Sequence, residues 1–462
     1  MSTEFLARLQ FAVTIGFHYI YPPLSIGLGV ILVMMEGLYL KTKEKKYEEM
    51  TRFWVKVFAL TFAIGVATGI VMEFEFGTNW ATYSRFVGDV FGSALAAEGI
   101  FAFFLESGFL AILVFGWDKV SPRVHFLSTV LVSLGSMLSA VWIVVANSWQ
   151  QTPAGYHLVK HGSIIRAEIT DFWGMVFNPS SMDRLSHTLS GAWQAGAFMV
   201  ISVSAFYMLK KRHMDFARTS LRMGLYLAMF ASLFQLFTGH QSAVGVAKNQ
   251  PAKLAAFEAH YDSSAAAGMY LFGWVDDNNK QVNLGIKIPG MLSYLLYGDM
   301  SQPVIGLDSF KKSDQPPVNV VFQTYHLMVA IGMALILISF VSFYMYRKGK
   351  LEKSTLWLKL LVASVLLPQI ANQLGWFSAE VGRQPWVVYG LLRTSEGLSK
   401  SVNGNQIVFS LILFTIIYIM LFALFIFLLD NKIKHGPEHT EDMESEYDRQ
   451  KELFHGSENA AQ

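Results

Sequence analysis

The chain has 462 residues, of which 53% are hydrophobic, 14% aromatic and only 15% charged. Soluble proteins carry roughly 25% charged residues, so this composition, with a mean hydropathy of +0.38, excludes a set of soluble domains and indicates an integral membrane protein. The formal net charge of +2 gives no basic field for nucleic acid, and the lack of cysteine excludes disulfides, thiolate metal sites and iron–sulfur clusters.

The N-terminal residues do not show the charged region, apolar stretch and cleavage site of a removable signal peptide, so none is expected. A membrane-spanning helix needs about 20 mostly apolar residues. Nine stretches qualify: Leu9–Leu40, Phe53–Phe76, Ala94–Phe115, Val124–Ala146, His187–Leu209, Leu221–Gly239, Val318–Tyr346, Leu356–Phe377 and Ile407–Leu429. Pro22 and Pro23 predict a kink in the first span, and Pro368 predicts one in the eighth.

Lysine and arginine cluster in one set of loops, at Lys41–Arg52, Lys119–Arg123, Lys210–Arg222 and Arg347–Lys359. Such loops face the cytoplasm in most membrane proteins. We therefore expect an all-α bundle of nine transmembrane helices with the N-terminus outside and the C-terminus cytoplasmic. The expected parts are helices one to six in residues 1–239, an extracytoplasmic loop in 240–317, helices seven to nine in 318–430 and a polar cytoplasmic tail in 431–462.

The long connection at 240–317 is unusual, since loops of this length are mostly functional. A short helix is expected at Pro251–His260, because proline is favoured at a first helical position. Beyond it the sequence turns polar around Asp276–Asn279.

Ionisable residues inside the spans mark candidate functional positions, because burying them in lipid is costly. His18 is either a neutral histidine bonded to a neighbouring helix or a ligand to haem or a metal. A histidine such as His187, paired with Met328 from another span, could complete a six-coordinate haem. Met328 alone carries no signal among 21 methionines. Only His18, His187 and His326 lie clearly within spans, which argues against a haem–copper site.

Glu98 and Glu106 are eight residues apart. On a continuous α-helix they would lie about 80° apart around the axis and about 12 Å apart along it, so both could face one interior. They either reach water from the two ends of the span or form a proton relay. Glu36, beside Lys41, is expected at the membrane interface.

Five stretches carry a family resemblance: ARLQFAVTIGFHYIYPPLSIG, FGTNWATYSRFVGDVFGSALAAEG, SAVWIVVANSWQQTPAGY, QPAKLAAFE and GWFSAEVGRQPW. With them, the chain resembles subunit I of the cytochrome bd-type quinol oxidases over nearly its whole length, in the form with a short outer quinol loop. The resemblance implies nine helices and three haems. These are a low-spin haem b (b558-like), a high-spin haem b (b595-like) and a haem d, or a further haem b in its place.

The resemblance also implies roles for individual residues. His18 and Glu380 match ligands of the two high-spin haem irons, and His187 and Met328 match the axial pair of the low-spin haem b. Glu98 matches a carboxylate beside the oxygen-reducing haems and is a further candidate ligand. The remaining matches are Glu106, Ser139 and Asn147 in proton conduction, and Arg8, Trp376 and Arg383 beside the haems. His326 stands where familiar relatives often carry arginine, so it has either replaced a propionate partner or competes as a ligand.

Lys253 and Glu258 fall in the motif QPAKLAAFE of the outer loop. A glutamate can accept a proton from quinol and a lysine can hold its oxygen. Five residues apart on a helix, they would lie about 140° apart and flank a quinol ring. The alternative is a pair of solvated surface charges.

The implied activity is that of a terminal respiratory oxidase in the bacterial cytoplasmic membrane. It would oxidise ubiquinol or menaquinol at the outer face and reduce O2 to water with cytoplasmic protons, which separates charge without a pump. The implied partners are a second subunit in a heterodimer, a small single-helix subunit as a further candidate, and the lipid bilayer. A bd-like oxidase with only b-type haems stays open. A nine-helix transporter with an outer gating loop also stays open, although it would need neither the His187/Met328 pair nor GRQPW.

Overall fold

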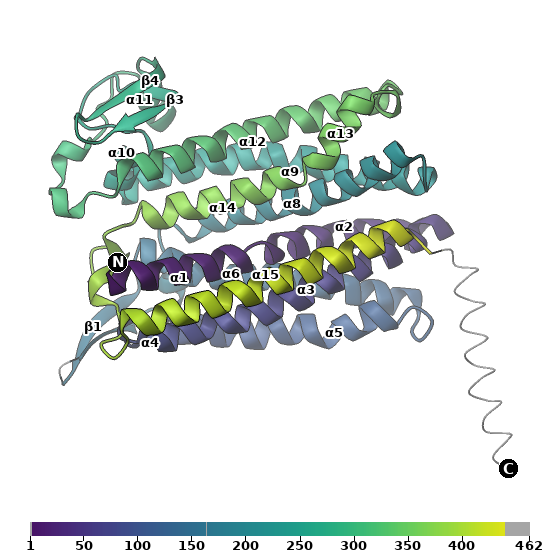
Figure 1. The fold of residues 1–462 in the computed structure, drawn as a ribbon, viewed down its shortest axis with the longest axis horizontal. Coiled ribbons are helices and arrows are strands. Elements are labelled where there is room, and N and C mark those ends of the chain that lie inside the picture. Colours follow the sequence, from purple (N-terminus) through teal and green to yellow (C-terminus); the bar gives the residue numbers. More distant parts are fainter. Residues whose placement is uncertain (1, 163, 439–462) are drawn as a thin grey trace, which may run out of the picture.

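The computed structural model describes residues 2–162 and 164–438, which form a long bundle of parallel and antiparallel helices (Figure 1). Within these described residues, nine helices are long and apolar enough to cross a membrane, as the sequence predicts. Residues 439–462, most of the expected cytoplasmic tail, lie outside the described part of the chain.

The elements of the first half follow the predicted spans with two changes. They are α1 (Thr3–His18), α2 (Tyr21–Thr42), α3 (Lys45–Thr78), α4 (Ala81–Glu98), the π-helix η1 (Gly99–Phe103), α5 (Phe104–Phe115), α6 (Pro122–Gln151), β1 (Tyr156–His161), β2 (Ile164–Ile169), α7 (Phe172–Val176), α8 (Ser181–Lys210) and α9 (Met214–Asn249). The first span breaks between α1 and α2 directly before the two prolines, as expected. The third span begins at Ala81, well before the predicted start, and α9 continues ten residues beyond the predicted end at Gly239.

The second half contains the long connection and three further spans. Its elements are α10 (Pro251–Phe257), β3 (Met269–Asp276), β4 (Gln281–Ile288), α11 (Met291–Tyr297), η2 (Leu307–Ser309), η3 (Lys312–Asp314), α12 (Val318–Arg347), η4 (Leu351–Lys353), α13 (Thr355–Ala363), α14 (Leu366–Val381), β5 (Trp386–Val388), β6 (Leu392–Arg393), η5 (Thr394–Glu396) and α15 (Gly404–His435). The eighth span breaks between α13 and α14, and Pro368 lies in the first turn of α14, where its missing amide hydrogen is tolerated.

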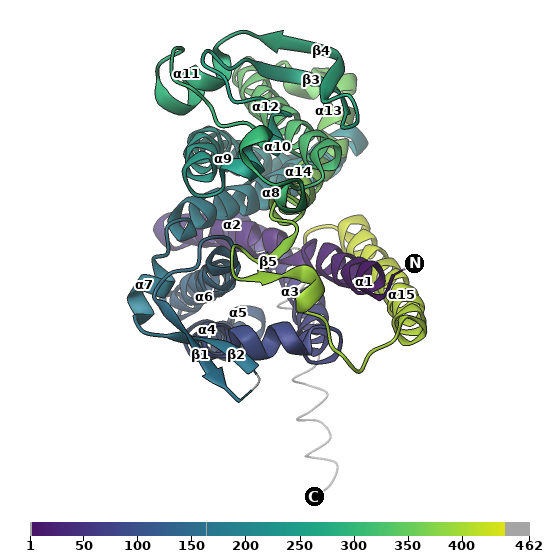
Figure 2. The same ribbon diagram turned by 90° about the vertical axis from the view of Figure 1, so that its left-hand side faces the viewer.

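Besides the short antiparallel pair of β5 and β6, two longer antiparallel β-hairpins were not predicted from the sequence. Strand β1 pairs with β2, and β3 pairs with β4 in a register that joins Met269 to Ile288 and Asp276 to Gln281. The polar residues after Asp276 therefore form the turn of a hairpin within the long connection, which runs from residue 250 to 317. Both hairpins lie at the same end of the bundle (Figure 2).

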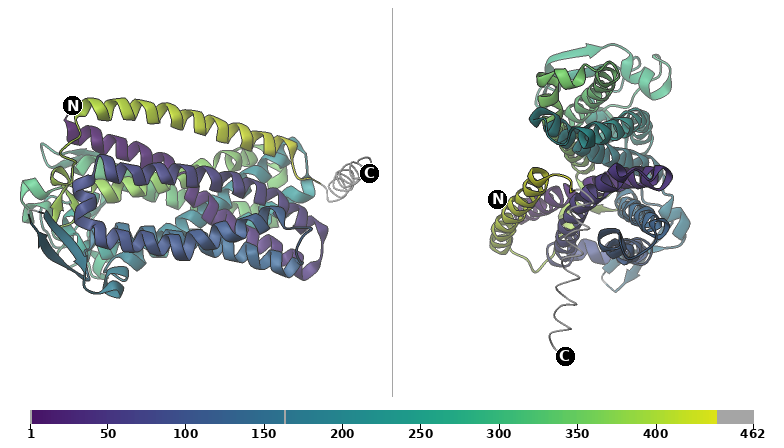
Figure 3. Two further views of the ribbon diagram at one scale, coloured as in Figure 1. Left: turned by 90° about the horizontal axis from the view of Figure 1, so that it is seen from below. Right: turned by 90° about the vertical axis from the view of Figure 1, so that its right-hand side faces the viewer.

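The bundle has two chemically different ends. One end, called here the hairpin end, holds the N-terminal residues, both hairpins and α10, and the last described residues lie at the opposite end (Figures 1 and 3). The turns at 43–44, 116–121, 211–213 and 348–354 carry or adjoin the lysine and arginine clusters, and we call their end the basic end.

Helix α8 lies at the centre of the bundle, with most of its apolar residues buried. It packs against α2 through Gly27 and Gly196, where a Cβ added to Gly196 would lie 2.3 Å from the carbonyl carbon of Gly27. Only glycine lets two helix backbones come this close. The contact joins the helices before α8 to those that follow it, and large apolar side chains such as Trp54, Phe58 and Phe198 fill the core around it.

Candidate functional site

A cavity of about 1520 Å³ extends through the bundle. Side chains of α1, α2, α3, α4, α5, α6, α8, α9, α12 and α14 line it, together with residues of the long connection. Of the eleven site residues predicted from the sequence, all except Lys253 lie on its wall. These residues are Arg8, His18, Glu98, Glu106, His187, Glu258, Met328, Trp376, Glu380 and Arg383. They come from segments far apart in the chain, so the fold gathers them at one place.

His18 ends α1, directly before the break in the first span. Its Nδ1 lies 2.9 Å from the hydroxyl of Thr68, which already donates to the carbonyl of Ile64 at 2.9 Å. The hydroxyl therefore accepts from Nδ1–H, and the lone pair of Nε2 stays available. A histidine held through one nitrogen, with the other free, has the usual arrangement of a haem or metal ligand.

His187 on α8 is oriented in a similar way. Its Nδ1 lies 3.2 Å from the hydroxyl of Thr238, and its Nε2 lies 3.1 Å from the side-chain amide of Gln235. The amide donates, so Nε2 is an acceptor whose partner an iron ion could displace. Met328 on α12 also faces the cavity, and its sulfur packs so closely against Gly375 of α14 that a Cβ there would lie 2.8 Å away.

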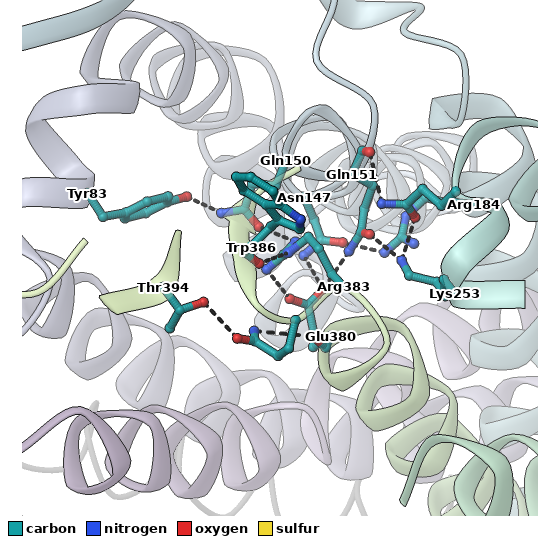
Figure 4. Close-up of polar contacts among 12 residues, drawn as sticks. Tyr83, Asn147, Gln150, Gln151, Arg184, Lys253, Glu380, Arg383, Trp386 and Thr394 are labelled. Atoms are coloured by element: carbon teal, nitrogen blue, oxygen red, sulfur yellow. Dashed lines mark hydrogen bonds and ion pairs between the residues drawn. The ribbon is translucent and has the colours of Figure 1, made fainter. Parts of the chain in front are cut away.

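Glu380 near the end of α14 is the centre of a polar cluster (Figure 4). One carboxylate oxygen accepts hydrogen bonds from Asn147 at 3.0 Å and Gln151 at 3.2 Å. The other oxygen accepts from Arg383 at 2.5 Å, and Arg383 also donates to Gln150 at 3.0 Å. The candidate ligand is thus fixed in place by amides of α6 and by the arginine of GRQPW.

This cluster has more cations than anions. Arg184 donates to Asn147, and Lys253 donates to Gln151 and Gln250, so Arg184, Lys253 and Arg383 surround the single carboxylate of Glu380. Burial and the charges of Arg184 and Arg383 lower the pKa of Lys253 well below its ordinary value. The buried Nε of Arg184 has no hydrogen-bond partner within the described residues. An excess of buried positive charge with a free donor is the environment that a bound anion would complete.

The expectation of a continuous α-helix between Glu98 and Glu106 is wrong, because the π-helix η1 lies between them. Ser139 of α6 donates to Glu98 at 2.5 Å, and Ser136 donates to Glu106. These serines are only one turn apart on α6, so the wider π-helical turn brings both carboxylates to one face. Such π-helical segments are frequent at functional sites.

In the long connection, Lys253 and Glu258 are both buried, with 2% and 4% of their surface exposed. The reading as solvated surface charges is therefore wrong for both. The expected helix ends at Phe257, and Glu258 lies just beyond it. Lys253 faces the cluster around Glu380, whereas Glu258 faces the cavity. Burial raises the pKa of Glu258 to about 8.

His326 lies close to Glu258. Its Nδ1 is 3.0 Å from the carbonyl of Phe322 and its Nε2 is 2.9 Å from the carbonyl of Tyr270. Its Nε2 also lies 3.9 Å from the carboxylate of Glu258. Both ring nitrogens thus face backbone carbonyls at the hairpin end, which leaves neither of them free as a ligand in this arrangement.

The two remaining candidates are Arg8 and Trp376. Arg8 lies 4.0 Å from Glu4 one turn earlier on α1 and is half-exposed. Trp376 lines the cavity and packs edge-on against Phe377, with 5.2 Å between the ring centroids.

Several residues at the site were not predicted. Arg184, Gln150 and Gln151 belong to the cluster around Glu380, and Thr68 and Thr238 orient the two histidines. The signal for Arg184 was weak, because an arginine three residues before His187 at the start of a span usually lies at the interface. Gln150 and Gln151 fall within the motif SAVWIVVANSWQQTPAGY, and a glutamine pair at the end of an apolar helix was their one local signal.

Comparisons with known proteins identify the family of the chain. The family described as "Cytochrome bd terminal oxidase subunit I" matches residues 6–437. The "Cytochrome bd ubiquinol oxidase subunit 1" of Bacillus subtilis (strain 168) is 40% identical over 449 residues, which cover 95% of each chain. The "Cytochrome bd-II ubiquinol oxidase subunit 1" of Escherichia coli (strain K12) is 33% identical over 498 residues, which cover 94% of this chain and 96% of the relative.

The fold has a close counterpart among solved structures. A chain in "The structure of bd oxidase from Geobacillus thermodenitrificans" superposes with a TM-score of 0.88 at 29% identity, covering 94% of this chain and 99% of that one. Family, relatives and fold agree over nearly the full length. The chain therefore belongs to the cytochrome bd terminal oxidase subunit I family, a family of membrane-bound quinol oxidases.

Proposed function

We propose that this chain is the haem-bearing subunit of a terminal oxidase that oxidises quinol at the hairpin end and reduces O2 to water with protons drawn from the basic end. One observation carries the proposal. His18, His187, Met328 and Glu380, which come from four different helices, line a single cavity. Imidazole, thioether and carboxylate are the donor set that a cysteine-free chain can offer to haem iron.

The residues present fit haem as the cofactor. His187 and Met328 would hold the low-spin haem b, His18 one high-spin haem, and Glu380 the other. Haem supplies the electron transfer and the binding and reduction of oxygen. The chain supplies the imidazoles of His18 and His187, each held at Nδ1 by a threonine hydroxyl so that Nε2 can serve as the ligand atom. It also supplies an excess of cations around Glu380. Two propionate groups would balance that excess, since three cations and one carboxylate leave two positive charges when Lys253 is protonated.

Glu258 is assigned as the proton acceptor for quinol. Its carboxylate faces the cavity, one of its oxygens has no hydrogen-bond partner within the described residues, and its pKa of about 8 lies close to neutral pH. A general base works best when its pKa is near the working pH. Apolar side chains of β3 and α11, including Leu271, Leu292 and Leu295, line the same part of the cavity and suit the isoprenoid part of ubiquinol or menaquinol.

Lys253 is assigned a positioning role. It donates to Gln151, which in turn donates to Glu380 at 3.2 Å. Through this pair of contacts, the short helix α10 is joined to the candidate haem ligand. The hydrogen bonds of Lys253 to Gln151 and Gln250 would hold the cluster together on the side of quinol binding. Lys253 would then not flank the quinol ring opposite Glu258.

The basic end is assigned to the cytoplasm because lysine and arginine accumulate there. The N-terminus then lies outside with the hairpins. Protons released by quinol at Glu258 would leave outside, and protons consumed in oxygen reduction would enter past Glu106 and Glu98. The two reactions would separate charge without a pump. The relatives named above are each called subunit 1, which supports a second subunit as partner in the bacterial cytoplasmic membrane.

A visible absorption spectrum of the purified complex tests this proposal. We expect haem absorption bands that change when dithionite reduces the protein, together with quinol-dependent oxygen consumption. Extraction of the haems would then identify their types. A colourless protein with the same fold would contradict the proposal and favour a transporter.

A further inference from the structure

Helix α6 carries a row of polar side chains that begins near the basic end. His125, Thr129, Ser133, Ser136 and Ser139 follow one another at spacings of three or four residues, which places them on one face of the helix. We call this row the α6 polar stripe. Its first four members are at most 4% exposed. A continuous polar row buried inside a membrane bundle is costly and calls for a function.

Three glutamates from other helices bind to this stripe in order. At its start, Glu36 of α2 contacts His125 at 2.6 Å and accepts from Thr129. Further along, Ser136 donates to Glu106 and Ser139 donates to Glu98. The last two glutamates belong to the proposed oxygen-reducing site, whereas Glu36 has no part in it so far.

Only 1% of the surface of Glu36 is exposed, so neighbouring helices enclose its carboxylate. The Nε2 of His125 lies 3.2 Å from the carbonyl of Leu113, and a carbonyl can only accept. Nε2 therefore carries a hydrogen. The contact between Nδ1 and the carboxylate of Glu36 then holds one proton, which resides on either the imidazole or the carboxyl group.

A chain of side-chain contacts joins this pair to the charged surface of the basic end. The ring of Trp117 lies over His125 with 3.9 Å between centroids, and the guanidinium of Arg52 lies 4.6 Å from the Trp117 ring. Arg52 pairs with Glu48 at 2.8 Å and with the exposed Asp118 at 3.2 Å. The ionisable groups that face the pair from neighbouring elements are Tyr39, Glu48, Arg52 and Asp118.

From these contacts we infer that the Glu36–His125 pair is the entry site for protons consumed in oxygen reduction, and that Thr129 and Ser133 pass them to Ser136 and Glu106. The pair, which holds one shared proton, takes up a second from the basic end and releases one along the stripe, which returns it to its starting state. Gly29 of α2 leaves room for this route, because a Cβ there would lie 3.1 Å from the hydroxyl of Ser133. The inference rests on the proposed function.

A purely structural role is the competing explanation, in which the pair only ties α2 to α6. The substitution Glu36→Gln distinguishes the structural role from proton transfer, because an amide keeps a hydrogen bond to His125 but cannot carry a proton between groups. Thr129→Val adds a second test, and Thr61→Val is its matched control. Both threonines are buried and bond the carbonyl four residues earlier on their own helix, but Thr129 alone of the two also bonds a carboxylate.

The experiment uses the complete oxidase complex in lipid vesicles that hold a pH-sensitive dye on the side of the basic end. We expect Glu36→Gln to slow both oxygen consumption and proton uptake by roughly tenfold or more, with unchanged haem content and thermal midpoint. Glu36→Asp should restore part of the rate. Thr129→Val should slow uptake severalfold, and Thr61→Val should leave it unchanged.

Normal uptake in Glu36→Gln and in Thr129→Val would overturn the inference. The inference would also be overturned if Glu36→Gln lost haem and thermal stability in proportion to its loss of rate, while Thr129→Val took up protons at the normal rate. Failure of the proposed function would look different, because the unmodified complex itself would then lack haem or quinol-dependent oxygen consumption.

Discussion

Lys253 and Glu258 belong to one short segment, yet their side chains enter different parts of the molecule. The ammonium of Lys253 donates to Gln151 and Gln250 beside Glu380, whereas the carboxylate of Glu258 lies 3.9 Å from His326 and faces the cavity. The segment ends its helix at Phe257, so the two residues do not share a helix face. In the proposed function, the sequence motif that contains both serves two tasks, positioning at one site and proton transfer at the other.

Glu258→Gln should abolish quinol oxidation while the haems stay bound. The amide preserves the shape of the side chain but removes the proton acceptor, so the rate should fall roughly a hundredfold or more. Oxygen consumption with quinol measures this, and reduction by dithionite shows whether the haems are intact. Asp299→Asn, an exposed carboxylate of the same long connection, is the control and should have no effect. A normal rate in Glu258→Gln would mean that the loop only covers the site.

The pH dependence of quinol oxidation should follow the ionisation of Glu258. Its pKa is raised to about 8 by burial, and the acceptor role needs the ionised form. Only about a tenth of the molecules would be ionised at pH 7, so the rate should increase as the pH rises through 8 and level off above it. Steady-state rates between pH 6 and 9.5 test this. A rate that already levels off below pH 6.5 would contradict the assignment.

Lys253→Met should alter the haem environment as well as the activity. The substitution removes the donor to Gln151, whose amide also bonds Glu380. We expect slower quinol oxidation and a shift of the high-spin haem absorption, a shift that Glu258→Gln should not produce. Lys248→Met, an exposed lysine in the last turn of α9, is the matched control. If the spectrum of Lys253→Met equals that of the unmodified complex, the positioning role is wrong.

Met328→Leu should remove the low-spin haem spectrum and leave the high-spin signals largely unchanged, because it takes away one of two axial bonds. Leucine has a similar volume, so the packing against Gly375 should persist. A low-spin spectrum that survives the substitution would make His326 the better candidate, even though both of its ring nitrogens face backbone carbonyls in this structure.

Much of this fold could be predicted because the bilayer restricts which structures can span it. Apolar stretches of spanning length identified nine helices, and Pro22 and Pro368 marked the two breaks. The site residues followed from motifs whose spacing is specific to the family. Their gathering around one cavity could not be deduced from spacing alone, since it depends on how α1, α4, α5, α8, α12 and α14 rotate and pack.

Other features left little or no local signal. The π-helix at Gly99–Phe103 has an ordinary apolar sequence, and its wider turn is coupled to the packing of Glu98 and Glu106 against α6. The strands Met269–Asp276 and Gln281–Ile288 contain β-favouring residues on either side of a polar turn, but in so apolar a chain this pattern also fits other structures. The partner of Glu36 could not be predicted, because His125 lies 89 residues away in the sequence.

The reduced-minus-oxidised visible spectrum of the complex with His187→Ala, compared with that of the unmodified complex, tests the central claim most directly. We predict haem bands in the unmodified complex and a selective loss of the low-spin band in the variant. Gln235 should not replace the missing imidazole, since an amide is a poor iron ligand and donates its hydrogen toward Nε2 in this structure. Identical spectra for the two proteins, or no haem bands in either, would contradict the account.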